Sequence, residues 1–359
     1  VEYTLKHGLC GASAFGFALY GYTSRNIDTA VQYGRLAMEI IEKFHARGWL
    51  ARVQLLVYGV LLPLKIPLRE SLHPLMIAQK VGMETGDVEH AYFTTIFYCL
   101  NALDVGRPLE TVEREIMEFS KGLKMRKHNI NLALLQPCTD FVRCIMGLVD
   151  PIAFLDDTSY ESELKDVLSI AIACYQKLVI AFLFGQLKRA MEFASISMAN
   201  FGKLPGDMYF MWQCHFFAAL TRFARLREPN STLTSREKQQ NVREVRRAIK
   251  RFGQWASWNP SNCASRLYLL EAEMAAMMGD SRVAGLKFKS ALAMSAAEDY
   301  LLEHSLGNEL EGRYLESRSD LEGAKQSFES ACTGYRTWGG CGKADHLENE
   351  MNDMNTVFS

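Results

Sequence analysis

The stretch from Trp258 to Glu348 decides the fold of this chain, because it contains two tandem copies of one helical pattern. In each copy an apolar helical segment is followed by a two-residue turn, and alanine stands five residues after the start of that turn. The copies read Gly279-Asp280 to Ala284 and Ser319-Asp320 to Ala324, and the stretch opens with Trp258-Asn-Pro-Ser-Asn262. The two alanines are 40 residues apart. Such a period is typical of stacked helix pairs rather than of a compact enzyme core.

The same turn signal occurs along the whole chain. Its copies are Arg25-Asn26 to Ala30, Gly86-Asp87 to Ala91, Gly185-Gln186 to Ala190, Gly279-Asp280 to Ala284, and Ser319-Asp320 to Ala324. Glycine or serine ends one helix, an Asx side chain accepts hydrogen bonds from free N–H groups of the next, and alanine allows close helix packing. Each copy therefore predicts a helix start. No segment shows sustained period-2 alternation, so we expect essentially no strand.

These signals predict an all-α, TPR-like helical-hairpin repeat array, that is, an α-solenoid of about seven to eight hairpins. Two polar interruptions divide it, at 150–160 and at 228–234, each ending in a capping-box pattern, Thr158-x-x-Glu161 and Thr234-x-x-Glu237. We expect N-terminal helical repeats over 1–149, middle repeats over 161–226, and C-terminal repeats over 234–348 that end in a Trp-Gly turn. The three groups should form one continuous superhelix.

Composition indicates a folded protein without a dominant electrostatic field. The chain has 359 residues, of which 48% are hydrophobic and 23% charged, and its net charge of -1 does not favour binding to nucleic acid or to a membrane surface. The most apolar run, Leu168 to Gly185, is interrupted by Gln176-Lys177, so we expect a buried helix and no membrane span.

Nine cysteines, odd in number and without a CxxC pair, indicate free thiols in a reducing compartment, so we expect a cytoplasmic location. The chain begins with valine, which suggests a piece of a longer protein.

Motifs for catalysis and metal binding are missing from the sequence. The histidines show no HxxxH or HExxH spacing, and there is no G-x-S-x-G, kinase loop or dinucleotide fingerprint. Gly339-Gly-Cys-Gly342-Lys343 is superficially like a phosphate loop, but Ala344 follows the lysine and a helix precedes it, so we interpret it as a helix-breaking turn. We expect no catalytic, cofactor-binding or metal-binding residue in this segment.

One basic cluster is a candidate partner-binding site. It consists of Arg243, Arg246, Arg247, Lys250 and Arg251, on the long helix that Thr234 is expected to cap. A face that binds nucleic acid or an acidic partner is one interpretation. The other is a solvated helix face or a contact with the acidic repeats nearby, because Phe252, Trp255 and Trp258 follow at i, i+3 and i+6 as a packing face would.

Several stretches together resemble a known module. They are Pro67 to Leu75, Gly82 to Tyr92, Tyr160-Glu161, Trp258-Asn-Pro260, Leu269 to Glu273, Asn308-Glu-Leu310, and Tyr335-Arg-Thr-Trp338-Gly339 with Lys343-Ala344 and Leu347-Glu348. The sequence resembles the helical, tetratricopeptide-like region of very large signalling proteins. In those proteins a serine/threonine-kinase-like domain and an AAA-type ATPase precede this region, and a GAF domain and often a histidine kinase follow it. The chain departs from the family at Leu64-Lys65-Ile66, where an aromatic residue is common, and at the Gly-rich turn after Trp338.

The resemblance implies a non-catalytic scaffold or regulatory segment of a multidomain signal-transduction kinase. ATP would then belong to the parent protein, none of whose catalytic residues lies in this stretch, and the partners would be other proteins or neighbouring domains of the same chain. An alternative is a free-standing TPR-like adaptor for protein–protein interaction. A third hypothesis, an enzyme in its own right, requires a pocket with converging titratable groups.

Overall fold

The computed structural model describes residues 2–24, 26–125, 129–159, 164, 166–228 and 233–358, and these contain helices and no strand. The first half comprises α1 (Glu2–His7), α2 (Ser13–Thr23), α3 (Ile27–Lys43), α4 (Leu50–Leu56), α5 (Leu72–Thr85), α6 (Val88–Asp104), α7 (Leu109–Met125), α8 (Asn129–Met146) and α9 (Pro151–Asp156). The second comprises α10 (Val167–Leu183), α11 (Leu187–Phe201), α12 (Tyr209–Arg227), α13 (Ser235–Trp258), α14 (Pro260–Met278), α15 (Ser281–Ala297), α16 (Leu301–Ser317), α17 (Leu321–Trp338) and α18 (Cys341–Phe358). Neighbouring helices pack in pairs, which confirms the all-α hairpin array.

Each of the five turn signals begins a helix, as predicted. Gly86, Gly185, Gly279 and Ser319 adopt positive φ and end the preceding helix. The side chains of Asn26, Asp280 and Asp320 accept from the first free N–H groups of α3, α15 and α17. Asp87 and Gln186 occupy the same position without a side-chain cap, so glycine alone marks these two starts.

The alanine of each signal lies between the two helices that the turn joins. All five alanines are at most 3% exposed: Ala30, Ala91, Ala190, Ala284 and Ala324. The pairs concerned, α2–α3, α5–α6, α10–α11, α14–α15 and α16–α17, are the most extensively packed pairs of the described chain. A methyl side chain at this point lets two helix backbones approach closely, which is why the signal predicts a hairpin as well as a helix start.

The two interruptions differ from each other. The segment 150–160 contains the short helix α9, whose Asp150 cap accepts from the N–H of Ala153 at 2.8 Å. Glu161, half of the first expected capping box, lies outside the described residues. The second capping box is confirmed: the hydroxyl of Thr234 accepts from the N–H of Glu237, and the Glu237 carboxylate accepts from the N–H of Thr234.

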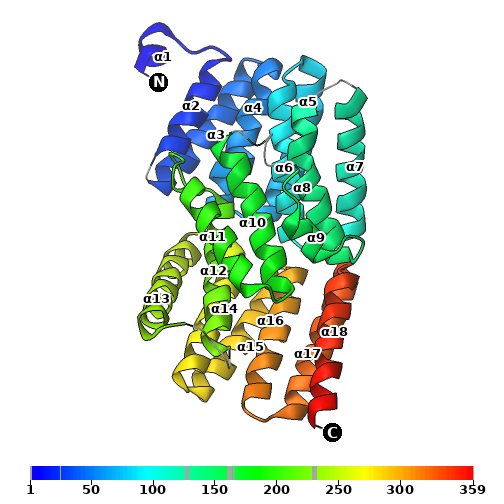
Figure 1. Ribbon diagram of the computed structural model, residues 1–359. Helices are drawn as coiled ribbons and strands as arrows, with labels where there is room; N and C mark the ends of the chain where they lie inside the picture. The colour runs from blue at the N-terminus through cyan, green and yellow to red at the C-terminus, as the bar shows by residue number, and fades with distance from the viewer. Residues whose placement is uncertain are drawn as a thin grey trace.

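The array folds back on itself, so segments far apart in the sequence lie side by side. Figure 1 shows α2–α8 at one end of the molecule, α14–α18 at the other, and α10–α12 running between them. One cluster of buried side chains extends from Ala30 to Leu347. The repeats therefore share a core, and the division into 1–149, 161–226 and 234–348 stays a prediction.

Two asparagines of the opening stretch join the two ends of the array. The amide nitrogens of Asn259 and Asn262 donate to the carbonyls of Pro63 and Ile66 at 2.8–3.1 Å. The Asn262 carbonyl oxygen accepts from the N–H of Leu68 at 2.9 Å. We call this pair the asparagine clamp. It supplies hydrogen bonds to the backbone between α4 and α5, where the short 3-10 helices Leu62–Leu64 and Leu68–Ser71 take the place of α-helix around Pro63 and Pro67.

The apolar run at 168–185 is a buried helix, as expected. It forms most of α10, and its two polar residues, Gln176 and Lys177, are 0% and 2% exposed within the protein. Gln176 contacts the sulfur of Cys138 at 3.0 Å, and the Lys177 ammonium donates to the carbonyl of Asp157 at 2.7 Å. Within the described part of the chain, no helix is both long and apolar enough to cross a membrane.

Replacing Ser319 by glycine should stabilise the protein. Ser319 has φ of 62°, which costs a residue with a Cβ about 1 kcal/mol or more, and part of that gain is offset because glycine makes the unfolded chain more flexible. We expect Ser319→Gly to raise the free energy of unfolding by about 0.5 to 1 kcal/mol in urea titrations. The control Ser290→Gly, at an exposed position inside α15, should lower it by a similar amount.

Candidate functional site

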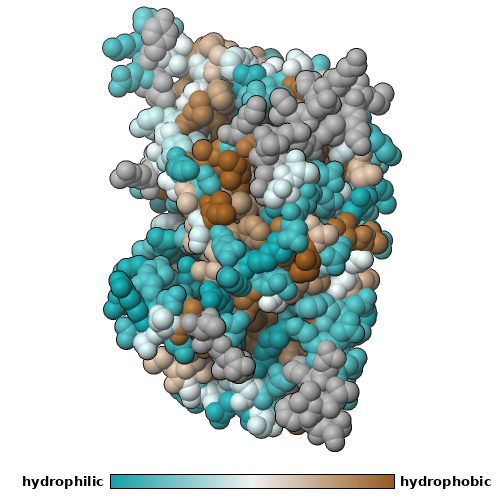
Figure 2. Space-filling view, in the orientation of Figure 1, coloured by the Kyte–Doolittle hydropathy of each residue, from teal (hydrophilic) through white to brown (hydrophobic). Residues whose placement is uncertain are grey.

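The five predicted basic residues lie on the exposed side of α13. This helix is capped by Thr234 and buries Val245, Ala248, Phe252 and Trp255 against the array. Arg243, Arg246, Arg247, Lys250 and Arg251 are all exposed, and we call them the basic face. The outer side of α13 is hydrophilic in Figure 2. The structure therefore places all five on one helix with their charged groups in solvent.

Two members of the basic face have partners inside the protein. Arg247 pairs with Glu244 at 2.6 Å, and the Arg251 guanidinium lies 3.0 Å from the Nε2 atom of His215. Burial and the nearby charges of Arg251 and Arg222 lower the pKa of His215 to about 4, so the imidazole is neutral at pH 7 and accepts from Arg251. In the chain as described, Arg243, Arg246 and Lys250 have no ion pair.

The aromatic residues after the basic face are only partly a packing face. Phe252 is fully buried and Trp255 is 8% exposed, and Trp255 stacks on Trp212 with ring centroids 4.9 Å apart. Trp258 is 38% exposed, so the expectation of packing was wrong for this residue. Trp258 is the last residue of α13, at the point where the chain turns at Asn259, so its indole lies at the end of the packed face.

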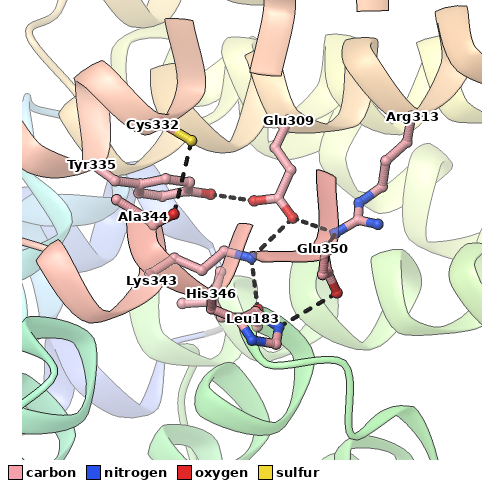
Figure 3. A network of polar contacts seen from close by, with 9 residues as sticks. All are labelled: Leu183, Glu309, Arg313, Cys332, Tyr335, Lys343, Ala344, His346 and Glu350. Carbon is pink, nitrogen blue, oxygen red and sulfur yellow. Dashed lines mark hydrogen bonds and ion pairs between the residues drawn. The ribbon is translucent and has the colours of Figure 1, made fainter. Parts of the chain in front are cut away.

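A second cluster of charged residues, partly buried, lies where the C-terminal helices meet α10 (Figure 3). The Lys343 ammonium, which has no exposed surface, donates to the carbonyl of Leu183 at 2.7 Å and to Glu309 at 3.0 Å. Arg313 pairs with Glu309 at 2.8 Å and with Glu350 at 2.7 Å. The hydroxyl of Tyr335 donates to the second oxygen of Glu309 at 2.8 Å. We call Glu309, Arg313, Tyr335, Lys343 and Glu350 the C-terminal joint.

The charges of the C-terminal joint compensate one another. Burial alone would raise the pKa of Glu309, but the charges of Lys343 and Arg313 outweigh it and hold that pKa below its usual value. Burial also opposes ionisation of Glu350, yet His346 and Arg313 lower the pKa of Glu350 to about 2. Both carboxylates are thus ionised and engaged at neutral pH. A carboxylate so fully satisfied is a poor proton acceptor.

The turn before the C-terminal joint brings α18 against the first half of the chain. Gly339 has φ of 95° and ends α17, which confirms a helix-breaking turn at Gly339-Gly340. The prediction was wrong for Cys341, Gly342 and Lys343, which already belong to α18. The Trp338 indole N–H donates to the carbonyl of Arg107 at 3.0 Å. Gly147 touches the backbone of Gly342, and a Cβ added at Gly147 would lie 2.9 Å from the Gly342 Cα. Both positions leave no space for a side chain.

A third group of charges is buried near the asparagine clamp. Arg266 pairs with Glu303, and both side chains are at most 3% exposed. Arg266 also donates to the hydroxyl of Tyr209. Burial raises the pKa of Asp104 to about 6, although Arg266 and Gln213 lower it in part. Asp104 is therefore the carboxylate of this group whose pKa burial raises towards physiological pH.

Sequence reasoning missed the C-terminal joint as a cluster. It singled out Lys343 in the segment that is superficially like a phosphate loop, and Tyr335, Trp338 and Lys343 through the family resemblance, without relating them to Glu309, Arg313 or Glu350. It also ended the array at 348, whereas α18 continues to Phe358. One signal was present: Lys343 stands beside Ala344 and four residues before Leu347, so a lysine lies on a helix face that is otherwise apolar. Both neighbours are fully buried.

The comparisons with known proteins leave the function to be argued from the structure. The chain matches no family model, and no curated protein matches it significantly. No group of three or more His, Cys, Asp or Glu side chains is placed to hold a metal ion in the described ranges. The basic face and the C-terminal joint are therefore the features on which a functional argument depends.

Removing one charge of the C-terminal joint should destabilise the protein more than removing two. Lys343→Met leaves the buried Glu309 carboxylate short of a partner and should lower the free energy of unfolding by about 3 to 5 kcal/mol. Adding Glu309→Gln should restore a substantial part of this loss, because the amide still accepts from Tyr335. Urea unfolding of both single variants and the double variant measures the coupling. Additive losses would contradict the proposed pairing.

Asp104 should make stability depend on pH. Its folded pKa of about 6 lies above the unfolded value of 3.8, so its contribution to stability is lost as pH rises from 3.8 to about 6. Relative to Asp104→Asn, the unaltered chain should lose about 3 kcal/mol across that window. Urea titrations at several pH values check this. The same pH dependence in the unaltered chain and in Asp104→Asn would contradict this prediction.

Proposed function

We propose that this chain is a non-catalytic helical-repeat scaffold within a cytoplasmic, multidomain signal-transduction kinase. In this role it holds an ATPase and kinase part and a sensor part at a fixed separation, and passes a displacement of one to the other. ATP would be bound by the parent protein and not by this segment. The resemblance at Tyr335–Gly339 and Lys343 motivates the proposal, and the burial of Tyr335, Trp338 and Lys343 is the observation that supports it most directly.

Rigidity at the C-terminal end is what the scaffold role needs. Lys343 ties α18 to α16 and to the end of α10, and Trp338 ties α17 to the backbone just before α7. A module attached at either end of such an array moves with it as one body, because packed cores do not deform continuously. The resemblance indicates which kinds of domain would adjoin this segment. The hydrogen bonds and the ion pair of Lys343 and Trp338 would transmit a displacement between those domains.

A free-standing TPR-like adaptor is the second candidate, and the basic face favours it. Arg243, Arg246 and Lys250 project from α13 into solvent without an internal ion pair in the described structure, and they form a stripe of one sign. Such a stripe is complementary to an acidic protein surface and increases the rate of encounter with it. The same stripe also serves the scaffold role if the acidic surface belongs to a neighbouring domain.

The coding sequence on either side of this chain tests the scaffold proposal. We expect it to encode an AAA-type ATPase or kinase-like domain upstream and a GAF or histidine-kinase domain downstream. The isolated chain should show no ATP hydrolysis or autophosphorylation above a heat-denatured control in a radiolabelled-phosphate assay. A gene that encodes only this chain would contradict the scaffold role and leave the adaptor.

Charge reversal on the basic face tests partner binding. We expect Arg243→Glu/Arg246→Glu/Arg247→Glu to abolish capture of an acidic partner or neighbouring domain in pull-downs at low salt. Binding of the unaltered chain should weaken as salt is raised, because exposed charges are screened. Reversal of Arg282, Lys289 and Lys325, which lie on other helices, is the matched control. Equal capture by both triple variants would remove the basic face as a binding site.

A further inference from the structure

A groove opens beside the C-terminal joint and is lined by residues of α10, α11, α12, α14, α16, α17 and α18. Its volume is about 760 Å³, which is within the range of small-molecule sites in proteins. Its apolar wall consists of aliphatic and aromatic side chains, those of Phe182, Leu187, Leu220, Ala224, Leu310 and Leu321. The rest of the lining consists mostly of charged side chains. The groove lies on helices that are fixed by the joint, so it is preformed.

The charges of the groove do not balance. Five carboxylates and two guanidinium groups line it: Glu228, Glu273, Glu309, Glu316, Glu350, Arg227 and Arg313. Both arginines are already engaged, Arg227 with Glu273, and Arg313 with Glu309 and Glu350. Glu228 and Glu316 have no ion pair in the part of the chain that the structure describes. The lining therefore offers hydrogen-bond acceptors of negative charge and has no cation left to match them.

Glu273 adds an independent sign of a missing partner. Its side chain is only 1% exposed, and one carboxylate oxygen pairs with Arg227. The other oxygen, also buried, has no hydrogen-bond partner. Leaving a buried charged acceptor unsatisfied is costly, and native proteins seldom do so without a ligand, a water molecule or an ion at the site. The unsatisfied oxygen belongs to a residue that lines the groove.

We propose that the groove binds a small organic cation, with an ammonium or guanidinium group held near Glu273 and an aliphatic stem packed against Leu220 and Leu310. The cationic group supplies the N–H donor that the free oxygen of Glu273 lacks, and a guanidinium does so with planar, directed donors. Leu220 and Leu310 are 1% and 6% exposed and give the stem a dry apolar surface. This inference stands apart from the scaffold role, because it depends on the groove alone.

The chemical class of the ligand follows from the lining of the groove, because its apolar and charged side chains together disfavour other kinds of molecule. An anion would meet the two carboxylates that lack an ion pair, Glu228 and Glu316, and a neutral polar molecule would leave both of these charges unmatched. A compact hydrated cation, such as a metal ion, would gain nothing from the apolar wall. A cation on an aliphatic stem of several carbons satisfies both parts of the lining at once, and it fits a volume of this size with room for a second polar end towards Glu316.

Butylguanidinium and its neutral isostere butylurea test the proposal on the full chain. We expect ligand-observed NMR titrations at millimolar concentration to give a Kd at least about tenfold lower for butylguanidinium, because hydrogen bonds to a buried charge discriminate by that factor. Glu273→Gln should remove this preference. Glu271→Gln is the matched control, because Glu271 lies on the same helix but pairs with Lys287 outside the groove, and it should keep the preference.

A second variant tests the groove independently, in case Glu273→Gln does not fold. Ala224→Phe fills the groove from α12 without changing charge, and it should abolish binding of butylguanidinium. Circular dichroism and thermal unfolding establish that each variant is folded. Equal affinity for butylurea, no binding of butylguanidinium by the unaltered chain, or a cation preference that survives both Glu273→Gln and Ala224→Phe would each overturn the proposal.

Discussion

The structure depends on a single buried ammonium group. Lys343 has no exposed surface, and an ammonium in that position is tolerated only if all its surroundings are arranged to receive it. Its acceptors come from two other parts of the chain, the carbonyl of Leu183 at the end of α10 and the carboxylate of Glu309 in α16. Three helices are thereby fixed relative to one another by one charge.

The other long-range contacts also fix distant parts of the chain relative to one another. Asn259 and Asn262 satisfy the backbone around Pro63 to Leu68, and Trp338 binds the carbonyl of Arg107. These contacts join residues roughly two hundred positions apart in the sequence, and all of them use hydrogen bonds from buried side chains. Hydrogen bonds of this kind specify one arrangement because every alternative leaves a polar group unpaired. A repeat array, which is usually held by contacts between neighbours only, is in this protein also closed by contacts between distant repeats.

Local features were predictable from the sequence, and long-range features were not. The turn signals placed five helix starts, and Thr234-x-x-Glu237 placed the start of α13, because capping and left-handed turns depend on a few adjacent residues. The exposure of the basic face also followed from helical periodicity. By contrast, no periodic pattern in the sequence relates Lys343 to Leu183, so their hydrogen bond could not be predicted. The exposure of the Trp258 indole depends on the direction that the chain takes after α13, which a local pattern does not specify either.

The contact between Gly147 and Gly342 has a consequence for how such a chain can change in evolution. Open arrays gain or lose whole repeats by duplication or deletion, since each unit needs only its immediate neighbours. Here the backbone at the end of α8 touches the backbone at the start of α18, and neither residue can carry a side chain. Inserting or removing one hairpin between them would displace that meeting point by a full repeat. The closure of the array therefore constrains the number of its repeats.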